Sequence, residues 1–267
     1  GMVPKTNIPG NERRWFSPGN ELDTWMDAED LGLVSVNEEI PAWAATIKPM
    51  QTFLMGNTVF AIEICEDLMA PHSPSVQLAT NGAEIILNLS ASNEIAGKRA
   101  HRQELVKYQS ASCNCIYAFC SAGYTESTSD LVFSGHSVIA ENGVVLKENE
   151  KYVDSGYMMV QDCDLGRIRA ERQKNPSFRQ AAYFYGSREY LNESMLGNAQ
   201  LRSDGSLYPV QKLPFIPATK AERDAYCKDV FRIQAAGLAQ RLKTINSNAV
   251  IGISGGLDST LALLVCV

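Results

Sequence analysis

Strand-length apolar runs alternate with helix-forming segments along much of the chain, and this alternation constrains the fold more than any other feature. β-Branched, apolar runs occupy residues 59–65, 85–89, 116–122 and 157–160. Segments rich in good helix formers occupy residues 97–114 and 164–175. The stretch "HSVIAENGVVL" adds two short strands around an "ENG" turn. Strands that alternate with helices predict an α/β layered domain.

The pattern changes near residue 203, which predicts a second unit. The stretch "SDGSLYPVQKLPFIP" is rich in turn formers and proline, as linkers are. We expect a long amphipathic helix over residues 219–243, then a buried strand, "AVIGI", that leads into the loop "SGGLDS" and an apolar helix. The predicted organisation is a first domain over residues 1–205, a linker over 206–218 and the beginning of a second domain over 219–267.

The composition is that of an ordinary globular protein. Hydrophobic residues make up 45%, charged residues 20%, and the net charge is -6. This charge excludes the basic surfaces that bind nucleic acid or anionic membranes. No run approaches the ~18 apolar residues of a membrane helix, and the N-terminus has no apolar signal core. The seven cysteines, an odd number, favour reduced thiols, so we expect a cytoplasmic protein.

The densest cysteine group lies in "SASCNCIYAFCSA" and lacks the spacing of a zinc knuckle. None of the three histidines of the chain lies beside it. We therefore expect core thiols near a helix-to-strand junction rather than a metal site, at Cys113, Cys115 and Cys120.

The loop "SGGLDS" has the features of an anion site between a strand and a helix. Its glycines let the backbone approach a ligand, while hydroxyls and unpaired helix N-terminal N–H groups form a cradle for phosphate. A simple glycine turn would not require serine at both ends and an acid inside. No Gly-Lys-Ser/Thr sequence follows, so this is not a Walker loop.

A cysteine, Cys65, ends the first predicted strand in "TVFAIEICEDLMAP", and two acids follow it. Free cysteine is among the most buried residue types, so the simplest interpretation is a structural thiol. By the same reasoning Glu66 and Asp67 are solvated acids of a turn, and Lys5 is a surface charge. The local sequence leaves a nucleophile and a buried thiol both open.

Several segments, in order, resemble known families. "VPKT" and "EICEDL" resemble the lysine and cysteine segments of the nitrilase (carbon-nitrogen hydrolase) superfamily, which uses a glutamate, a lysine and a cysteine. "SGGLDS" resembles the pyrophosphate-binding loop of ATP pyrophosphatases, which adenylate an oxygen and displace it with nitrogen. With "NLSASNEIAGK", "GYTESTSDLVFSGHSVIAENG", "PFIP" and "IQAAGLAQRL", nearly the whole chain resembles the glutamine-dependent NAD synthetase family.

The resemblance implies a fold and a reaction. The fold would be a nitrilase-like four-layer α-β-β-α sandwich, followed by the start of a Rossmann-like domain of the adenine nucleotide alpha hydrolase type. The reaction would be ATP-dependent amidation of nicotinate adenine dinucleotide (deamido-NAD) to NAD, with ammonia released from glutamine. ATP and Mg²⁺ would serve the synthetase domain, and the glutaminase domain would need no cofactor. A homo-oligomer that binds glutamine, deamido-NAD and ATP is also implied.

The resemblance also implies roles for residues of the first domain. Cys65 would attack the side-chain amide of glutamine, and Lys5 would place a positive charge beside the oxyanion, assisted by the backbone N–H of Glu66. The carboxylate of Glu66 would accept the α-ammonium of glutamine, and Ser92 would lie in the same pocket. Lys98 would pair with the α-carboxylate, although a lysine offers no bidentate fork.

In the second unit the resemblance implies an ATP site, with a metal ion at Asp258. The loop would hold the phosphates that leave as pyrophosphate, through Ser254, Gly255, Gly256, Asp258 and Ser259. The deamido-NAD site would lie mostly beyond Val267.

Two departures from the family pattern affect the first domain. The general-base glutamate of the family lies well upstream of its lysine segment, so we expect it before residue 1 and expect the chain to be a segment of a longer enzyme. Glu12 and Glu63 are the nearest substitutes, but Glu12 lies on a loop shorter than in relatives by about four residues, and Glu63 should be held by its strand. The shorter loop would also form a different pocket wall from that of the relatives.

Two alternatives of other classes remain open. A stand-alone amidase of the nitrilase superfamily would not need "SGGLDS". A catalytically silent nitrilase-like assembly module would fit the missing glutamate but not the retention of Lys5 and Cys65. Thiol labelling distinguishes the silent module, because its Cys65 would be no more reactive than an ordinary buried thiol.

Overall fold

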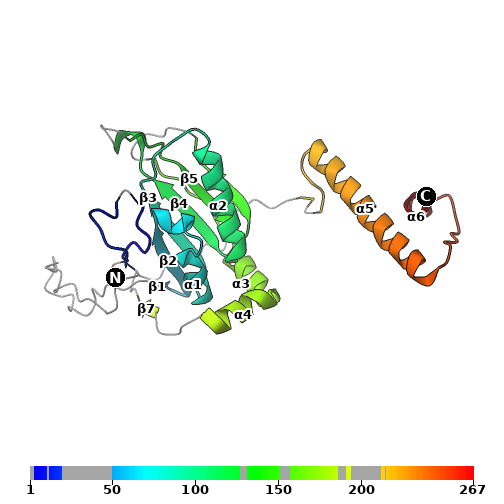
Figure 1. Cartoon of the computed structure of the whole chain (residues 1–267), viewed down its shortest axis with the longest axis horizontal. Helices are drawn as coiled ribbons and strands as arrows, with labels where there is room; N and C mark the ends of the chain where they lie inside the picture. The colour runs from blue at the N-terminus through cyan, green and yellow to red at the C-terminus, as the bar shows by residue number, and fades with distance from the viewer. Residues whose placement is uncertain are drawn as a thin grey trace. The chain divides into compact units, whose positions relative to one another are not determined.

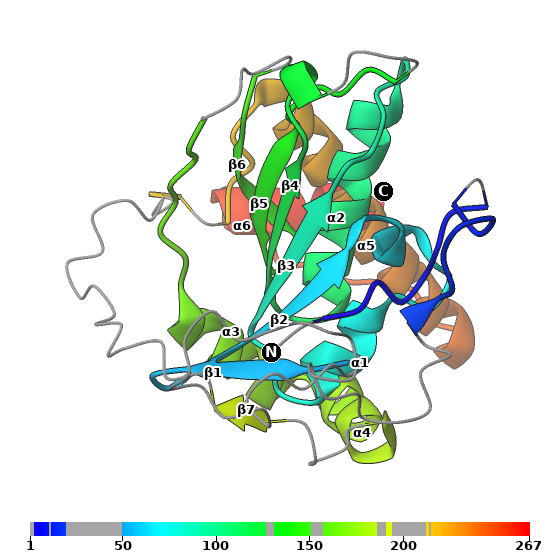
Figure 2. The same ribbon diagram turned by 90° about the vertical axis from the view of Figure 1, so that its left-hand side faces the viewer.

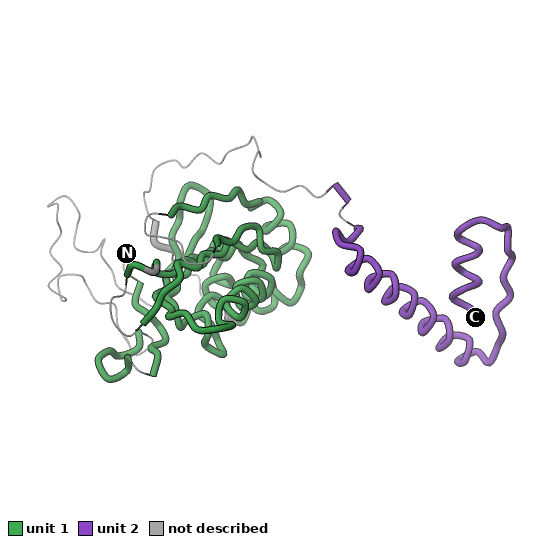
Figure 3. The backbone as a smooth tube through the Cα atoms, turned by 90° about the horizontal axis from the view of Figure 1, so that it is seen from above, with its two compact units in different colours: residues 1–208 green, residues 209–267 purple. Residues whose placement is uncertain are grey.

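The structure is a computed structural model that describes residues 3–10, 12–19, 50–126, 131–150, 157–185, 191–193, 212–213 and 215–267. The chain separates into two compact units, residues 1–208 and 209–267, which are coloured separately in Figure 3. Most of the predicted linker, residues 206–211 and 214, lies outside the described residues.

The first unit is built on one mixed sheet (Figure 1). Its seven strands follow the order β6-β5-β4-β3-β2-β1-β7. Its strands are β1 (Thr52–Met55), β2 (Thr58–Ile64), β3 (Ile85–Ser90), β4 (Ile116–Ser121), β5 (Ser137–Glu141), β6 (Val144–Glu148) and β7 (Leu191–Glu193). Its helices are α1 (Pro74–Thr80), α2 (Lys98–Ser112), α3 (Leu165–Lys174) and α4 (Pro176–Tyr185), with 3₁₀ turns η4 (Cys65–Met69) and η5 (Tyr124–Glu126). The predicted α/β layering is confirmed.

The three central strands β2, β3 and β4 are parallel, and the helices α1 and α2 connect them. Parallel neighbours need such crossovers, whereas antiparallel neighbours need only a turn. The β5–β6 hairpin turns at Asn142 (φ 46°) and Gly143 (φ 86°), the two positive φ values of a type I′ turn, which confirms the predicted "ENG" turn. β1 pairs antiparallel with β2 and parallel with β7.

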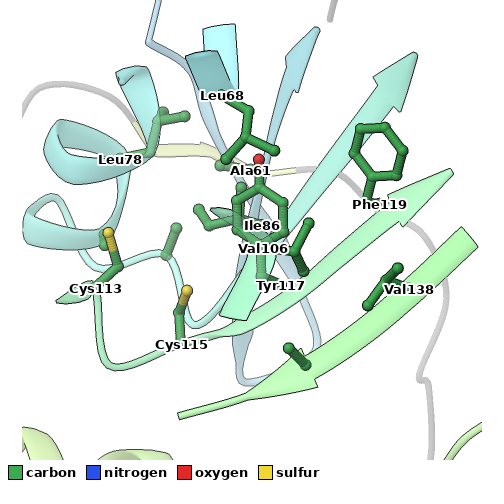
Figure 4. Packing of buried hydrophobic residues seen from close by; sticks show 13 residues of the cluster. Ala61, Leu68, Leu78, Ile86, Val106, Cys113, Cys115, Tyr117, Phe119 and Val138 are labelled. Carbon is green, nitrogen blue, oxygen red and sulfur yellow. The ribbon is translucent and has the colours of Figure 1, made fainter. Parts of the chain in front are cut away.

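One face of the sheet forms the core against α1 and α2 (Figures 2 and 4). A single row of paired positions, Ala61, Ile86, Tyr117 and Ala140, is fully buried on this face. The side chains that cover the row come from α1, α2 and η4, at Leu78, Val106 and Leu68. Alternation along the strands thus buries every second residue under the helices.

The opposite face is also apolar but only half-buried. The neighbouring row runs through Ile62, Leu87, Ala118 and Ile139, each of intermediate exposure.

The part of the chain that is described holds one sheet, and the predicted strand over residues 157–160 is wrong. That run has no ladder partner, its Met158 side chain is 80% exposed, and its Val160 carbonyl accepts a bond from a lysine side chain instead.

The predicted helices at residues 97–114 and 164–175 are confirmed as α2 and α3. Asp164 caps α3, because its side chain accepts the N–H of Arg167 at 3.0 Å. Four elements were not predicted, namely α1, α4, β1 and β7. α1 does carry a start signal, Ser73 followed by proline at the first helical position.

The second unit contains α5 (Lys220–Ile245) and α6 (Leu257–Cys266). Thr219 and Glu222 form a capping box that begins α5, and Asn246 ends the helix in the left-handed region at φ 51°. The predicted long helix is therefore confirmed, but its predicted amphipathic character is not, because none of its residues is buried. The predicted buried strand "AVIGI" is wrong, because its backbone is irregular and Val250 is 97% exposed. The described residues of this unit offer no strand with which it could pair.

Of the helices that the structure describes, none has both the length and the apolar character needed to cross a bilayer.

Candidate active site

Cys65 lies at the carboxyl end of β2, where it is the first residue of η4. Ile64 pairs with Leu89 near the end of the parallel strand β3, so the segment that follows β3 reaches the same edge of the sheet. That segment holds Ser92, which is 8% exposed, and leads to Lys98 at the start of α2. The fold therefore brings the expected nucleophile and pocket segments to one edge.

The backbone of Cys65 is in the left-handed region, with φ 50°. A residue with a side chain adopts this conformation at a cost of roughly 1–3 kcal/mol, and such strain persists where the surroundings hold it. Here the N–H of Cys65 donates to Asn88 Oδ1 at 3.2 Å. Asn88 is fully buried in β3, so the sheet itself holds the turn at the cysteine.

A buried carboxylate, Glu63, supports Asn88 from beneath. Glu63 accepts bonds from Asn88 Nδ2 at 3.3 Å, from the Ser75 N–H at 2.9 Å and from the hydroxyls of Ser73 and Tyr117. Burial raises the pKa of Glu63, and these hydrogen bonds oppose the shift. Both carboxylate oxygens of Glu63 accept hydrogen bonds, so Glu63 is unsuited to act as a substitute base. The groups that hold it are three side chains and one backbone N–H, not the backbone of its own strand as expected.

Lys98 shares an electrostatic environment with Cys65 and Glu66. Burial lowers the pKa of Lys98, and the positive charge of Arg102 lowers it further, while the negative charges of Cys65, Glu94 and Glu66 oppose the shift. The Nζ of Lys98 donates to the side chain of the nearby Asn93 at 2.7 Å. Three of the predicted residues, Cys65, Glu66 and Lys98, therefore lie at one edge of the sheet, near enough for their charges to interact.

Lys5 is bonded to Glu12, with Nζ 2.9 Å from Oε2. The turn in which the Glu12 N–H donates to Pro9 O folds the glutamate back onto the lysine. The two residues line a cavity of about 580 Å³ together with apolar side chains such as Phe16. Cys65 is not part of that lining. Sequence reasoning discounted Glu12, but the pairing shows that the shortened loop still returns to the lysine.

Asp67 is a residue whose place in the site sequence reasoning missed. The local sequence predicts a solvated turn acid, yet Asp67 is 1% exposed. Its carboxylate accepts the N–H of Ile64 at 2.9 Å, and from the lysine segment it accepts Asn7 N at 2.7 Å, Asn7 Nδ2 at 3.0 Å and Thr6 N at 3.4 Å. The only hint in the sequence was its position two residues after the cysteine.

A second buried charge cluster joins α2 to the segment before β5. Arg102 is fully buried, and its Nε donates to His136 Nδ1 at 3.1 Å. Nδ1 is therefore the acceptor, so Nε2 carries the proton and donates to Glu148 at 2.9 Å. Burial and the charges of Arg99 and Arg102 lower the pKa of His136 to about 4. Glu94 accepts bonds from Arg102 and from Ser134.

The predicted core thiols are confirmed at two of three positions. Cys113 and Cys115 are buried where α2 gives way to β4, whereas Cys120 points to the half-buried face of the sheet and is exposed. Over the described ranges, no group of three or more histidine, cysteine or acidic residues is placed to hold a metal ion.

In the second unit the loop "SGGLDS" leads directly into α6. Gly255 has φ 84°, Gly256 is the N-cap, and Asp258 lies in the first turn. Ser254 Oγ and Ser259 Oγ are 3.2 Å apart, so the two hydroxyls close the loop at its ends. The structure thus brings the predicted ATP-site residues together as an exposed loop at a helix N-terminus.

Comparisons with known proteins found several similar to this chain. The glutamine-dependent NAD(+) synthetase of Mycobacterium leprae is 33% identical over 277 aligned positions, which cover 99% of this chain and 39% of that protein. The human protein of the same name is 26% identical over 175 positions, which cover 64% of this chain and 24% of that one. A crystal structure of a glutamine-dependent NAD(+) synthetase from Cytophaga hutchinsonii matches 57% of this chain and 23% of that chain, with 21% identity and a TM-score of 0.44.

The chain thus spans about two fifths of the length of the mycobacterial relative, 39%. The family model for carbon-nitrogen hydrolases matches residues 13–173, a stretch that includes Cys65, Ser92 and Lys98. Because this match covers more than half of the residues, the chain belongs to the carbon-nitrogen hydrolase family.

Proposed function

We propose that the protein makes NAD from deamido-NAD in an ATP-dependent reaction, and that the first unit releases the required ammonia from glutamine. The observation that carries the proposal is Cys65, which is held at φ 50° at the end of β2 beside Glu66 and Lys98, within a carbon-nitrogen hydrolase match. The similarity to proteins named glutamine-dependent NAD(+) synthetase over 99% of the chain supports the choice of reaction.

Cys65 Sγ attacks the side-chain amide carbon of glutamine, which gives a tetrahedral adduct and then a thioester as ammonia leaves. Water then attacks the thioester and releases glutamate and the thiol. Lys5 stabilises the oxyanion, because a fixed positive charge beside developing negative charge lowers the barrier. The proton of the thiol needs a base, and the family resemblance predicts that base upstream of residue 1.

The polar groups near Cys65 suit the two ends of the amino acid. Glu66 accepts the α-ammonium group of glutamine, and Lys98 pairs with its α-carboxylate. Ser92, at the same sheet edge, donates a hydroxyl bond within the pocket. The lowered pKa of Lys98 reflects burial and the nearby Arg102, and an incoming carboxylate would offset both.

The second unit supplies the phosphate loop of the ATP site in this proposal. Ser254, Gly255, Gly256 and Ser259 offer hydroxyls and backbone N–H groups to the β- and γ-phosphates. Asp258 fits a magnesium ion, because Mg²⁺ commonly takes one or two protein carboxylates and fills its remaining positions with phosphate oxygens and water. The ion would neutralise phosphate charge as pyrophosphate leaves.

The finer architecture belongs to the same proposal. A second sheet would cover the half-buried row at Ile62, Leu87, Ala118 and Ile139 and complete a four-layer sandwich. Residues 219–267 would begin a Rossmann-like nucleotide-binding domain after a linker at 206–218. The enzyme would be a cytoplasmic homo-oligomer that acts on small molecules.

The test compares two nitrogen donors in the full-length protein. Cys65→Ala should abolish glutamine-driven NAD formation and leave ammonia-driven formation intact, because the half-reactions use separate sites. Cys120→Ala, which changes an exposed cysteine of the same unit, is the matched control and should affect neither activity. Equal loss of both activities in Cys65→Ala, with an unchanged circular dichroism spectrum, would contradict the proposal.

The ATP site has its own test. Asp258→Ala and Ser259→Ala should stop pyrophosphate release with either nitrogen donor, while glutamine hydrolysis at Cys65 continues. Undiminished pyrophosphate release in both variants would remove the loop from the reaction.

A further inference from the structure

In the described part of the first unit, one carboxylate accepts the hydrogen bonds that attach the lysine segment, residues 3–10 and 12–19. Among the described residues, every hydrogen bond between this segment and the sheet-and-helix core ends on Asp67. The donors are the N–H groups of Thr6 and Asn7 and the side-chain amide of Asn7. These donors follow Lys5 directly along the chain.

The other bonds of the segment are internal to it. Lys5 Nζ bonds Glu12, and Lys5 O accepts the N–H of Gly19 at 2.8 Å. These bonds shape the loop around Lys5, but they do not relate it to Cys65. A loop held only by internal bonds would move as a whole, so the attachment at Asp67 determines where the ammonium group lies relative to the sulfur.

Asp67 is well placed to be that attachment. It lies two residues after Cys65 in the same 3₁₀ turn, and its Oδ2 also accepts the N–H of Ile64, the residue before the cysteine. Its carboxylate therefore bonds the backbone on the nucleophile side and the backbone on the lysine side at once. The side chain is buried, so water does not compete for these bonds.

We propose that Asp67 is a positioning residue that sets Lys5 against Cys65 in the glutaminase site. The inference rests on the proposed function, because it gives Lys5 its role at the oxyanion. It predicts that loss of the attachment lowers the rate of the chemical step without removing a group that touches glutamine. A misplacement of about 1 Å at a catalytic group costs on the order of 100-fold in rate.

Asp67→Asn is the sharpest perturbation because it keeps the size of the side chain. The amide has one acceptor oxygen, and its NH₂ group must face either the Ile64 N–H or the donors of Asn7, so one side of the attachment is lost. Asn7→Ala is the milder variant, because it leaves Asp67 in place and removes only the bond that the side-chain amide of Asn7 donates to it. Gln103→Ala, on α2 and outside the attachment, is the matched control.

The first measurement is glutamine hydrolysis by the full-length protein, with ammonia-driven NAD formation followed in parallel. Asp67→Asn should lower kcat by roughly 10- to 100-fold with KM for glutamine within about threefold of wild type, since the pocket residues are untouched. Asn7→Ala should lie between it and wild type. Ammonia-driven NAD formation should be unchanged in all variants.

The second measurement separates positioning from a general structural role. Iodoacetamide alkylates Cys65 faster when a nearby positive charge favours the thiolate, and alkylation is measurable in variants that do not turn over. Asp67→Asn and Lys5→Ala should each slow alkylation at pH 7 by several-fold, and the double variant should be no slower than Lys5→Ala alone.

The outcomes are distinct. A wild-type protein that does not hydrolyse glutamine would refute the proposed function rather than this inference. An active wild type together with unchanged kcat and alkylation in Asp67→Asn and Asn7→Ala would overturn the inference. So would fully additive effects of Asp67→Asn and Lys5→Ala, because Asp67 would then act independently of the lysine. If Asp67→Asn lacks a native circular dichroism spectrum, Asn7→Ala decides alone.

Discussion

Tyr117→Phe should destabilise the first unit by removing one buried oxygen. The Tyr117 side chain is fully buried; its hydroxyl donates to Glu63 and accepts Asn88 Nδ2 at 3.1 Å. A hydrogen bond to a charged group contributes ~1.5–3 kcal/mol, and a buried donor left without an acceptor costs ~1–3 kcal/mol. Asn88 Nδ2 keeps its bond to Glu63, so only part of the cost of an unpaired donor applies. We expect a loss of about 2–4 kcal/mol in the free energy of unfolding.

The loss should depend on pH in a definite direction. Burial raises the pKa of Glu63 above its ordinary value of 4.5, and the bond from Tyr117 partly offsets this increase. A raised carboxyl pKa gives stability that is complete below the unfolded value and is lost as pH rises through the folded value. The variant raises the pKa of Glu63 further, so its deficit relative to wild type should grow as pH rises through the pKa of the folded-state carboxyl.

Native-state hydrogen exchange of the β3 and β4 amides measures this difference locally, without requiring two-state unfolding of the whole protein. Tyr157→Phe is the control, because Tyr157 is 51% exposed. A deficit below about 0.5 kcal/mol at pH 7, or one that shrinks as pH rises, would refute the reasoning.

Glutamine hydrolysis should also slow in Tyr117→Phe, since Asn88 holds the N–H of Cys65.

Three further predictions concern other sites. Gly143→Ala should lower the unfolding free energy by about 1–2 kcal/mol in a denaturation assay, because φ is +86° and the methyl group of Ala111 lies 3.1 Å from the new Cβ. Gly10→Ala is the control and should be neutral, because nothing lies within 4 Å of its new Cβ. Gly255→Ala, at φ +84°, should abolish pyrophosphate release whereas Gly252→Ala should not; equal rates would show that the loop conformation is unimportant. His136 is neutral when folded, with a pKa of about 4 against 6.5, so stability should fall as pH drops through this window, and His136→Gln should flatten that fall; an unchanged slope would contradict the assignment.

The sequence predicted the elements whose patterns are local. Good helix formers, caps or turn residues lie within a few positions of one another in α2, α3, α5 and the hairpin at Asn142. These elements could therefore be predicted without knowledge of the residues they contact in the fold. The runs at 157–160 and 249–253 have the same local pattern as true strands. They are not strands because a strand needs a neighbour to complete its hydrogen bonds, and neighbours are set by the rest of the fold.

The candidate site shows the same division. Cys65, Glu66 and Lys98 could be proposed only because their segments resemble those of a known family, since the local sequence alone leaves a buried thiol and solvated charges equally open. The engagement of Asp67 and the ion pair of Glu12 could not, because each depends on a partner that only the folded chain identifies: the backbone of Asn7 for Asp67 and the ammonium group of Lys5 for Glu12. Carboxylates in turns are exposed more often than not, so the closeness of Asp67 to the cysteine in the sequence was too weak a signal to predict its burial.

The strand order of the sheet has a consequence for biosynthesis. Strands β2 to β6 are contiguous in sequence and adjacent or nearly adjacent in space, so the centre of the sheet can assemble as soon as residues 58–148 have left the ribosome. The outer edge of β1 is different, because its partner is residues 191–193. Until those residues emerge, β1 presents unpaired backbone groups that can recruit a strand of another nascent chain. Slower translation between residues 149 and 190 would lengthen this interval and should increase the fraction of chains that aggregate during synthesis.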